Sequence, residues 1–284
     1  YDYGSTLPAT SLLSIKYILD NKNINFKYFE ESGYSDANKI YKNQYALPLM
    51  FKGNKQVLNV KDSYDIFQIQ NDLFSYLSGS GDVLTEITDV TVNMKNLTKT
   101  ISSGNGNFTK NNEDEEAYIE FTFTAINDEE IYGHFPTEPI SDSTVDVYVN
   151  GKKLRQHFDS NHLTYYDILN FGSFNEGEEV SIKFVLEENE TNYEAYYFYA
   201  LNMENFHEAY NTLSGDPMDI EIVNENHIKA SVNNLNANQL VFTSIPYDKG
   251  WKAYVDGQQV QPQKVMDSLM AIEMNAGNHH IELK

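Results

Sequence analysis

The acidic side chains and the seven histidines are the residues of this chain that could do catalytic or metal chemistry. Two acidic runs stand out, Glu113–Glu116 and Asp128–Glu130. Carboxylates grouped in this way can hold Ca²⁺, but neither run has the Asp-x-Asp-x-Asp-Gly spacing of a calcium-binding loop. We therefore interpret both runs as solvated loops and expect no metal site.

The histidines form no recognisable ligand or catalytic pattern. No His-Glu-x-x-His motif is present, and the adjacent His279 and His280 would point to opposite faces of a strand. The chain has no cysteine, which excludes disulfides, thiolate metal sites and cysteine nucleophiles. The Gly-x-Ser-x-Gly elbow of serine hydrolases is also missing. The remaining histidines are His134, His157, His162, His207 and His227.

These observations predict a segment without catalytic residues, cofactors or metals. One enzymatic alternative stays open, because no pattern among the 42 acidic residues excludes a pair of glycosidase carboxylates. An independent hydrolase with such a pair is therefore a further hypothesis.

Aromatic side chains are the other candidates for binding chemistry. The segment Ile245–Trp251 contains Tyr247 and the single Trp of the chain. A glycan-binding role would use Tyr247 and Trp251 as a platform for sugar rings, whose apolar C–H groups pack on aromatic faces. In the structural interpretation, which we favour, Pro246 ends a strand, Gly250 permits a turn, and Trp251 covers the end of a core.

A repeated β pattern positions these residues. In two places an alternating strand leads into an Asn-Gly or Asp-Gly pair and then into another apolar residue. The pairs are Asn150-Gly151 and Asp256-Gly257. Because both residue types tolerate positive φ, each pair fits a two-residue hairpin turn.

The repeat extends over a longer stretch of sequence. Four features recur in the same order: a helix ending in Leu-Ser-Gly, an apolar-Thr strand, the hairpin, and an Asn-x-Gly strand. The matched pairs outside the hairpin are Leu77–Gly79 with Leu213–Gly215, Ile119–Phe123 with Gln239–Thr243, and Gly177 with Gly277. This order predicts two tandem copies of one β module, of which the second is shorter.

The expected fold class is mainly β with some α (α+β). A small N-terminal α/β segment covers residues 1–81 and ends in an amphipathic helix, which Ser63 can cap and Gly79 ends. Two antiparallel β-sandwich modules of jelly-roll or immunoglobulin-like type follow, over residues 82–201 and 202–284.

Composition limits the possible partners. Twenty basic and 42 acidic residues give a net charge of −22, which would repel a nucleic-acid backbone and disfavours direct attraction to anionic lipid. No apolar run approaches the roughly 18 to 20 residues that span a bilayer. The chain begins without Met and stops inside an apparent strand, so we expect a segment of a longer protein; a processed natural N-terminus is the alternative.

Several motifs together resemble one family. The stretch Ser244–Trp251, then Val255–Gly257 and Ala276–Leu283, is similar to the C-terminal extracytoplasmic part of bacterial YfhO-type membrane proteins. Earlier segments resemble the family in the same order: Leu13–Ile18, Tyr41–Asn43 with Ala46–Pro48, and Phe67–Leu73. One departure is Ser14-Ile15, where the family pattern has Gly before Lys-Tyr.

The resemblance implies a polytopic membrane protein related to GT-C glycosyltransferases, which take sugar from a polyprenyl-phosphate carrier outside the membrane. Members are linked to glycosylation of cell-wall polymers such as lipoteichoic acid. In this superfamily the catalytic carboxylate lies on an early extracytoplasmic loop between membrane helices, which is not in this chain, so no catalytic residue is carried over.

The same resemblance implies that this chain is the soluble region at the extracytoplasmic face of the bacterial cell membrane. Its expected partners are its own transmembrane domain and a cell-wall glycopolymer or lipid-linked sugar, with an acceptor-binding or partner-positioning role. The alternative is a secreted or surface-anchored carbohydrate-binding or adhesive protein built from tandem β-sandwiches.

Overall fold

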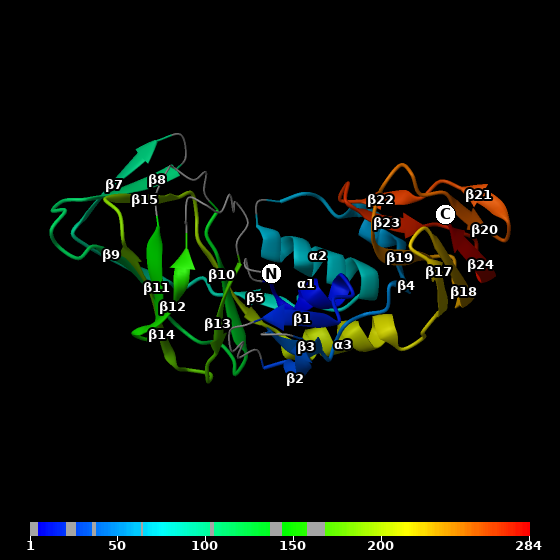
Figure 1. Cartoon of the computed structure of the whole chain (residues 1–284), viewed down its shortest axis with the longest axis horizontal. Helices are drawn as coiled ribbons and strands as arrows, with labels where there is room; N and C mark the ends of the chain where they lie inside the picture. The colour runs from blue at the N-terminus through cyan, green and yellow to red at the C-terminus, as the bar shows by residue number, and fades with distance from the viewer. Residues whose placement is uncertain are drawn as a thin grey trace. The chain divides into compact units, whose positions relative to one another are not determined.

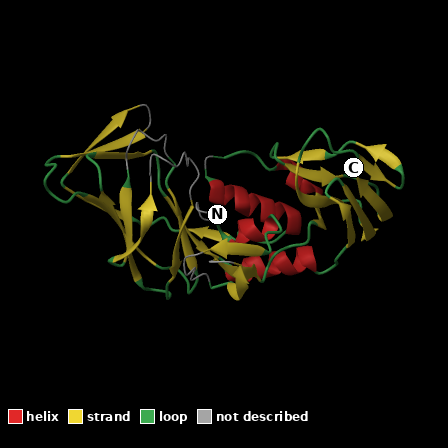
Figure 2. Ribbon diagram, viewed as in Figure 1, coloured by secondary structure: helices red, strands yellow, loops and turns green. Residues whose placement is uncertain are grey.

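The computed structural model describes residues 5–20, 27–35, 38–63, 65–102, 105–136, 144–157 and 168–284. In these ranges strands predominate and three α-helices interrupt them, as Figures 1 and 2 show. The helices are α1 (Leu7–Leu12), α2 (Ile66–Ser78) and α3 (Met203–Ser214), with a short 3-10 helix η1 at Lys55–Asn59. The prediction of a mainly β protein with some α is confirmed.

The chain forms two compact units, whereas the sequence predicts three consecutive segments. Unit 1 combines Tyr1–Thr6 with Thr85–Leu201, and unit 2 combines Leu7–Leu84 with Asn202–Lys284. The first and third predicted segments therefore share one unit. The reason is strand β4 (Met50–Asn54), which pairs antiparallel with β19 (Gln239–Pro246). The short apolar run of β4 does not indicate by its own residues that its partner strand lies almost 200 residues later in the sequence.

Unit 1 is a β-sandwich. Its larger sheet has the strand order β12-β11-β14-β9-β6, its smaller sheet has the order β13-β10-β16-β5, and a third sheet has the order β15-β8-β7. The strands are β5 (Leu84–Glu86), β6 (Thr91–Lys95), β7 (Leu97–Ser102), β8 (Asn105–Lys110), β9 (Tyr118–Thr124), β10 (Glu130–His134), β11 (Val145–Val149), β12 (Lys152–His157), β13 (Ile168–Ser173), β14 (Glu179–Leu186), β15 (Glu190–Tyr193) and β16 (Tyr197–Leu201).

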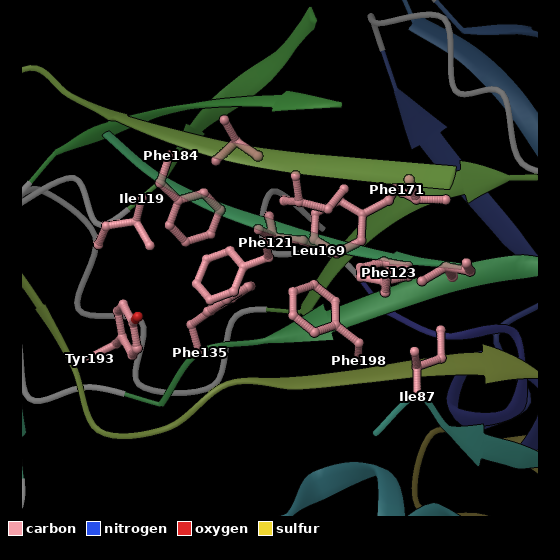
Figure 3. Packing of buried hydrophobic residues seen from close by; sticks show 14 of the residues in the cluster. Ile87, Ile119, Phe121, Phe123, Phe135, Leu169, Phe171, Phe184, Tyr193 and Phe198 are labelled. Carbon is pink, nitrogen blue, oxygen red and sulfur yellow. The ribbon is translucent and has the colours of Figure 1, made fainter. Parts of the chain in front are cut away.

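Alternation of side chains along the strands builds the core of unit 1. On β9 and β14 every second residue is buried, including Ile119, Phe121 and Phe184. Figure 3 shows Phe121 and Phe198, which come from the two main sheets, inside one cluster; their ring centroids lie 5.5 Å apart. Burial of this aromatic surface is the main stabilisation of the sandwich.

Unit 2 contains a second sandwich and a small N-terminal sheet. Its sheets have the orders β17-β18-β24-β20-β21, β22-β23-β19-β4 and β1-β3-β2. Met50 of β4 belongs to the same buried cluster as Val241 and Ile281, so the N-terminal segment supplies part of this core. The further strands are β1 (Tyr17–Asp20), β2 (Phe29–Ser35), β3 (Asn38–Asn43), β17 (Asp219–Asn224), β18 (His227–Leu235), β20 (Ala253–Val255), β21 (Gln258–Val260), β22 (Gln263–Val265), β23 (Leu269–Ile272) and β24 (Gly277–Leu283).

The two sandwiches share one strand order. In the larger sheets, β12-β11-β14-β9-β6 corresponds to β21-β20-β24-β18-β17, and in the smaller sheets β13-β10-β16 corresponds to β23-β19-β4. Two details differ from the predicted repeat. Ile119–Phe123 lies on β9, whose counterpart is β18, so it does not correspond to Gln239–Thr243 on β19. Strand β4, which precedes both modules in sequence, takes the place that β16 has in unit 1.

Helix α2 begins at a different cap from the predicted Ser63. The side chain of Asp65 accepts hydrogen bonds from the backbone N–H groups of Phe67 at 2.9 Å and Gln68 at 3.3 Å. Ser63 instead accepts a hydrogen bond from the backbone N–H of Asp65. Two otherwise unpaired donors of the first turn are thereby satisfied by the aspartate. Gly79 ends the helix with a φ of 82°, which suits a glycine C-cap.

Candidate functional site

The two Asn/Asp-Gly hairpin turns have positive φ at both central residues. Asn150 and Gly151 have φ angles of 46° and 78°, and Asp256 and Gly257 have φ angles of 50° and 81°. Each turn leaves two residues between paired strand ends, as in a type I′ hairpin. Gly277 begins β24 with a φ of 135°, a region that favours glycine.

The first residue of each turn also holds the neighbouring strand. Asn150 Oδ1 accepts a hydrogen bond from the backbone N–H of Ser181 at 2.8 Å. Asp256 Oδ1 accepts one from the backbone N–H of His280 at 2.9 Å. The same contact therefore fixes the β11–β12 hairpin against β14 and the β20–β21 hairpin against β24.

Asp256 makes a second contact that Asn150 does not make. Its Oδ2 lies 2.7 Å from Nδ1 of His279, and Nε2 of His279 lies 2.9 Å from the carbonyl oxygen of Asn275. Both oxygens can only accept, so both contacts are hydrogen bonds when each ring nitrogen carries a proton. The hydrogen bonds from the His280 backbone and from His279 lower the pKa of Asp256.

The outer face of the larger sheet of unit 2 is hollowed, with a volume of about 540 Å³. Glu221, Lys229, Glu282 and Tyr254 are paired in register and form one row across β17, β18, β24 and β20. A second row contains Asp219, Ser231 and His280. We refer to these seven residues as the Tyr254 face.

Charged groups surround the half-buried ring of Tyr254. Glu282 accepts hydrogen bonds from Lys284 Nζ at 2.8 Å and from His227 Nε2 at 2.7 Å, and these contacts, with that of Lys284 first, lower its pKa. Lys284 Nζ also lies 5.4 Å from the centroid of the Tyr254 ring. The glutamate is therefore paired, and the aromatic ring lies among hydrogen-bond donors and acceptors of the sheet.

The corresponding face of unit 1 repeats the tyrosine. Tyr148 pairs in register with Lys183, which pairs with Glu120. Tyr254 likewise stands beside a Glu-Lys pair in unit 2. Neither tyrosine belongs to the predicted glycan-binding pair, although each directly precedes the Val that leads into the repeated hairpin turn. The shared position within the repeat was the signal that could have identified them.

Tyr247 and Trp251, the candidate glycan-binding pair, are half-buried against the core of unit 2. Lys264 Nζ lies 5.0 Å from the centroid of the Tyr247 ring, so a cation occupies one side of it. Between the two aromatics, Gly250 donates its backbone N–H to Asp248 Oδ1 at 2.6 Å. A Cβ at Gly250 would lie 2.9 Å from that oxygen, so a larger residue would displace the exposed side chain of Asp248. This geometry fits the structural role of the segment.

Neither the acidic runs nor the histidines form a metal site within the described part of the chain. Glu113–Glu116 is exposed. Glu130 is the first residue of β10 and is buried in unit 1. Its carboxylate accepts a hydrogen bond from Tyr132 Oη at 2.5 Å. The expectation of a solvated loop is therefore wrong at this residue. His162 and the side chain of His157 lie outside the described residues.

Comparisons with known proteins place the chain in a family. Residues 1–284 match the family model described as bacterial membrane protein YfhO. The comparison with curated proteins gives no match. Across the described ranges, no helix combines the length and hydropathy needed to cross a bilayer.

Three solved structures are similar to parts of the chain. A family 35 carbohydrate binding module from Clostridium thermocellum is 15% identical with a TM-score of 0.29, covering 41% of this chain and 95% of that one. A CBM35 from Paenibacillus barcinonensis is 16% identical with a TM-score of 0.24, covering 42% and 94%. A Paenibacillus sp. cycloisomaltooligosaccharide glucanotransferase is 9% identical with a TM-score of 0.28, covering 80% of this chain and 50% of that one. From the family match over its whole length, the chain belongs to the YfhO family of bacterial membrane proteins.

Proposed function

We propose that this chain is the extracytoplasmic region of a polytopic, glycosyltransferase-like membrane protein that glycosylates a cell-wall polymer of the lipoteichoic acid type. The chain binds or positions the acceptor and does no chemistry of its own. Its own transmembrane domain carries out sugar transfer from a polyprenyl-phosphate donor. The observation that carries the acceptor role is the Tyr254 face, a hollow lined by an aromatic ring and paired charges.

The chemistry of this face favours an uncharged part of the acceptor. Three carboxylates line the hollow, those of Asp219, Glu221 and Glu282, against the ammonium group of Lys229. A phosphate would meet this negative balance, whereas sugar hydroxyls can donate to the carboxylates. Lys284 lies over the half-buried ring of Tyr254, and the part of the ring that it leaves open offers an apolar surface for the C–H groups of a sugar. The face therefore suits the sugar units of a polymer better than its phosphate groups.

The test uses the full-length protein in its host. A strain that lacks the gene is complemented with wild type, Tyr254→Ala or Tyr254→Phe, at matched protein levels, and glycosylation of the extracted polymer is measured. We expect Tyr254→Ala to lower glycosylation by about tenfold, the effect of roughly 1.4 kcal/mol in acceptor binding. Tyr254→Phe keeps the ring and should retain most of the activity.

Two results would count against the proposal. Normal glycosylation with Tyr254→Ala would exclude the Tyr254 face as the acceptor surface. Unchanged glycosylation after deletion of the gene, together with glycan binding by the isolated chain, would favour a carbohydrate-binding or adhesive protein instead.

A further inference from the structure

The net charge of the chain is unevenly distributed along the sequence. Residues 1–61 contain eight of the 20 basic residues but five of the 42 acidic residues. The N-terminal segment is therefore basic, and the entire negative excess lies after it. Three of its lysines, Lys39, Lys52 and Lys55, form ion pairs with carboxylates, so the charge of its surface depends on where the other lysines lie.

The small sheet β1-β3-β2 exposes apolar side chains beside some of these lysines. Tyr17 and Leu19 of β1 are 49% and 54% exposed, and they pair in register with Lys42 and Ile40 of β3. The intervening Ile18 points to the other side and is buried. We call the set Leu13, Lys16, Tyr17, Leu19, Ile40 and Lys42 the N-terminal face.

Two lysines frame the aromatic ring of this face. Lys16 is exposed, and its Nζ lies 5.7 Å from the ring centroid of Tyr17. Lys42 is exposed and lies opposite Tyr17 in the sheet. Glu30 of β2 is the residue opposite Lys42 on its other side and contributes one negative charge. Within the paired rows Lys42 and Glu30 balance, and Lys16, which directly precedes β1, adds one positive charge beside Tyr17.

These residue types are the ones that bind a lipid surface. A tyrosine can place its ring at the level of the headgroups, a leucine can enter the acyl boundary, and lysines can reach lipid phosphates along their apolar stems. Exposed apolar residues that lie together and are bordered by charged ones are typical of an interaction surface. We propose that the N-terminal face lies on the anionic headgroups of a lipid bilayer. This inference rests on the proposed placement of the chain at the outer face of the membrane.

Another exposed apolar site lacks this charge pattern and provides a control. Ile222 of β17 is 67% exposed, but its neighbours in the sequence include Glu221 and Glu225. An anionic bilayer would repel that site. Exposure alone therefore does not predict lipid contact. A comparison of the N-terminal face with Ile222 shows whether binding depends on positive charge or only on exposed apolar side chains.

The experiment exploits the absence of cysteine from the chain. Leu19→Cys or Ile222→Cys is labelled with the environment-sensitive dye NBD, and the chain is tethered through a C-terminal histidine tag to nickel-lipid vesicles. The vesicles contain phosphatidylglycerol and phosphatidylcholine, or phosphatidylcholine alone. We expect a blue shift and a rise of about twofold or more in emission at position 19 on the anionic vesicles, and no change at position 222.

Charge removal tests the mechanism directly. The changes Lys16→Gln and Lys42→Gln together, or about 0.5 M salt, should abolish most of the rise at position 19. The proposal is overturned by an equal response at position 222, by no response at position 19, or by an equal response on phosphatidylcholine alone. Circular dichroism of each variant checks that it is folded. None of these outcomes depends on Tyr254, so failure here and failure of the acceptor role are separate results.

Discussion

Truncation of Phe51 to alanine should destabilise the C-terminal part of the chain, although the two are far apart in sequence. Phe51 lies on β4, is 2% exposed, and is paired in register with Phe242 of β19. Their ring centroids lie 5.3 Å apart. Phe51→Ala therefore removes a buried ring from the pairing of edge strand β4 with β19, in a sheet that the N-terminal and C-terminal segments build together.

The expected loss of stability is large. A buried aromatic side chain removes about 150–250 Å² from water, and about 25 cal/mol per Å² converts this to an upper bound of roughly 4–6 kcal/mol. Phe→Ala replacements in cores typically lower the free energy of unfolding by about 3–5 kcal/mol. With a urea m-value near 2 kcal/mol/M, the midpoint of unit 2 should fall by about 2 M.

The single Trp makes the assay specific to unit 2. Trp251 lies in Asn202–Lys284, so its fluorescence during urea unfolding reports the C-terminal part of that unit. The matched control is Phe123→Ala, which removes an equally buried ring from the core of unit 1 and should leave the Trp251 midpoint unchanged. If residues 1–81 folded as a separate domain, Phe51→Ala would not move the Trp251 transition. That result would refute the shared unit, whereas an equal shift from Phe123→Ala would show that the Trp251 transition does not report unit 2 alone.

The remaining predictions concern the turns and the core. Asp256→Ala should lower the Trp251 midpoint, because the His280 N–H loses its acceptor, whereas Asp256→Asn should restore most of it, as Asn150 makes the same contact in unit 1. The pKa of Asp256 is lower in the folded chain than in the unfolded one. The stabilisation by this carboxylate is therefore present above about pH 4 and is lost as the pH falls through the folded pKa. Acid titration followed by Trp251 fluorescence should show a smaller loss of stability in Asp256→Asn than in wild type. Gly133→Ala should cost about 1–3 kcal/mol in unit 1 alone, since its Cβ would lie 2.5 Å from the Phe171 ring; calorimetry that shows no shift would contradict this packing.

The origin of one strand in the second sandwich could not be predicted from the sequence. In unit 1, β10 pairs with β16, which comes from the end of the same module. In unit 2 the corresponding strand β19 pairs instead with β4, which comes from the N-terminal segment. Nothing in the residues of β4 specifies this partner, because strand pairing is decided by the edge that is available and by burial on both faces.

Local features were accessible from the sequence alone. The hairpin positions at Asn150-Gly151 and Asp256-Gly257 follow from the backbone angles that these residue types tolerate. The apolar spacing of helix α2 and its C-terminal glycine are likewise local features, although the N-cap is Asp65 and not the predicted Ser63. The mainly β composition follows from alternation along many short segments.

Tertiary structure alone decided what these elements assemble into. The Tyr254 face combines residues from β17, β18, β20 and β24, which become neighbours only through pairing across the sheet. The N-terminal face appears only when Tyr17 and Leu19 are exposed while Ile18 is buried. Turn and helix signals depend on the φ, ψ preferences of a few adjacent residues and can be read locally. Pairing, burial and the grouping of charges depend on contacts between distant residues, whose energies exist only in the folded chain.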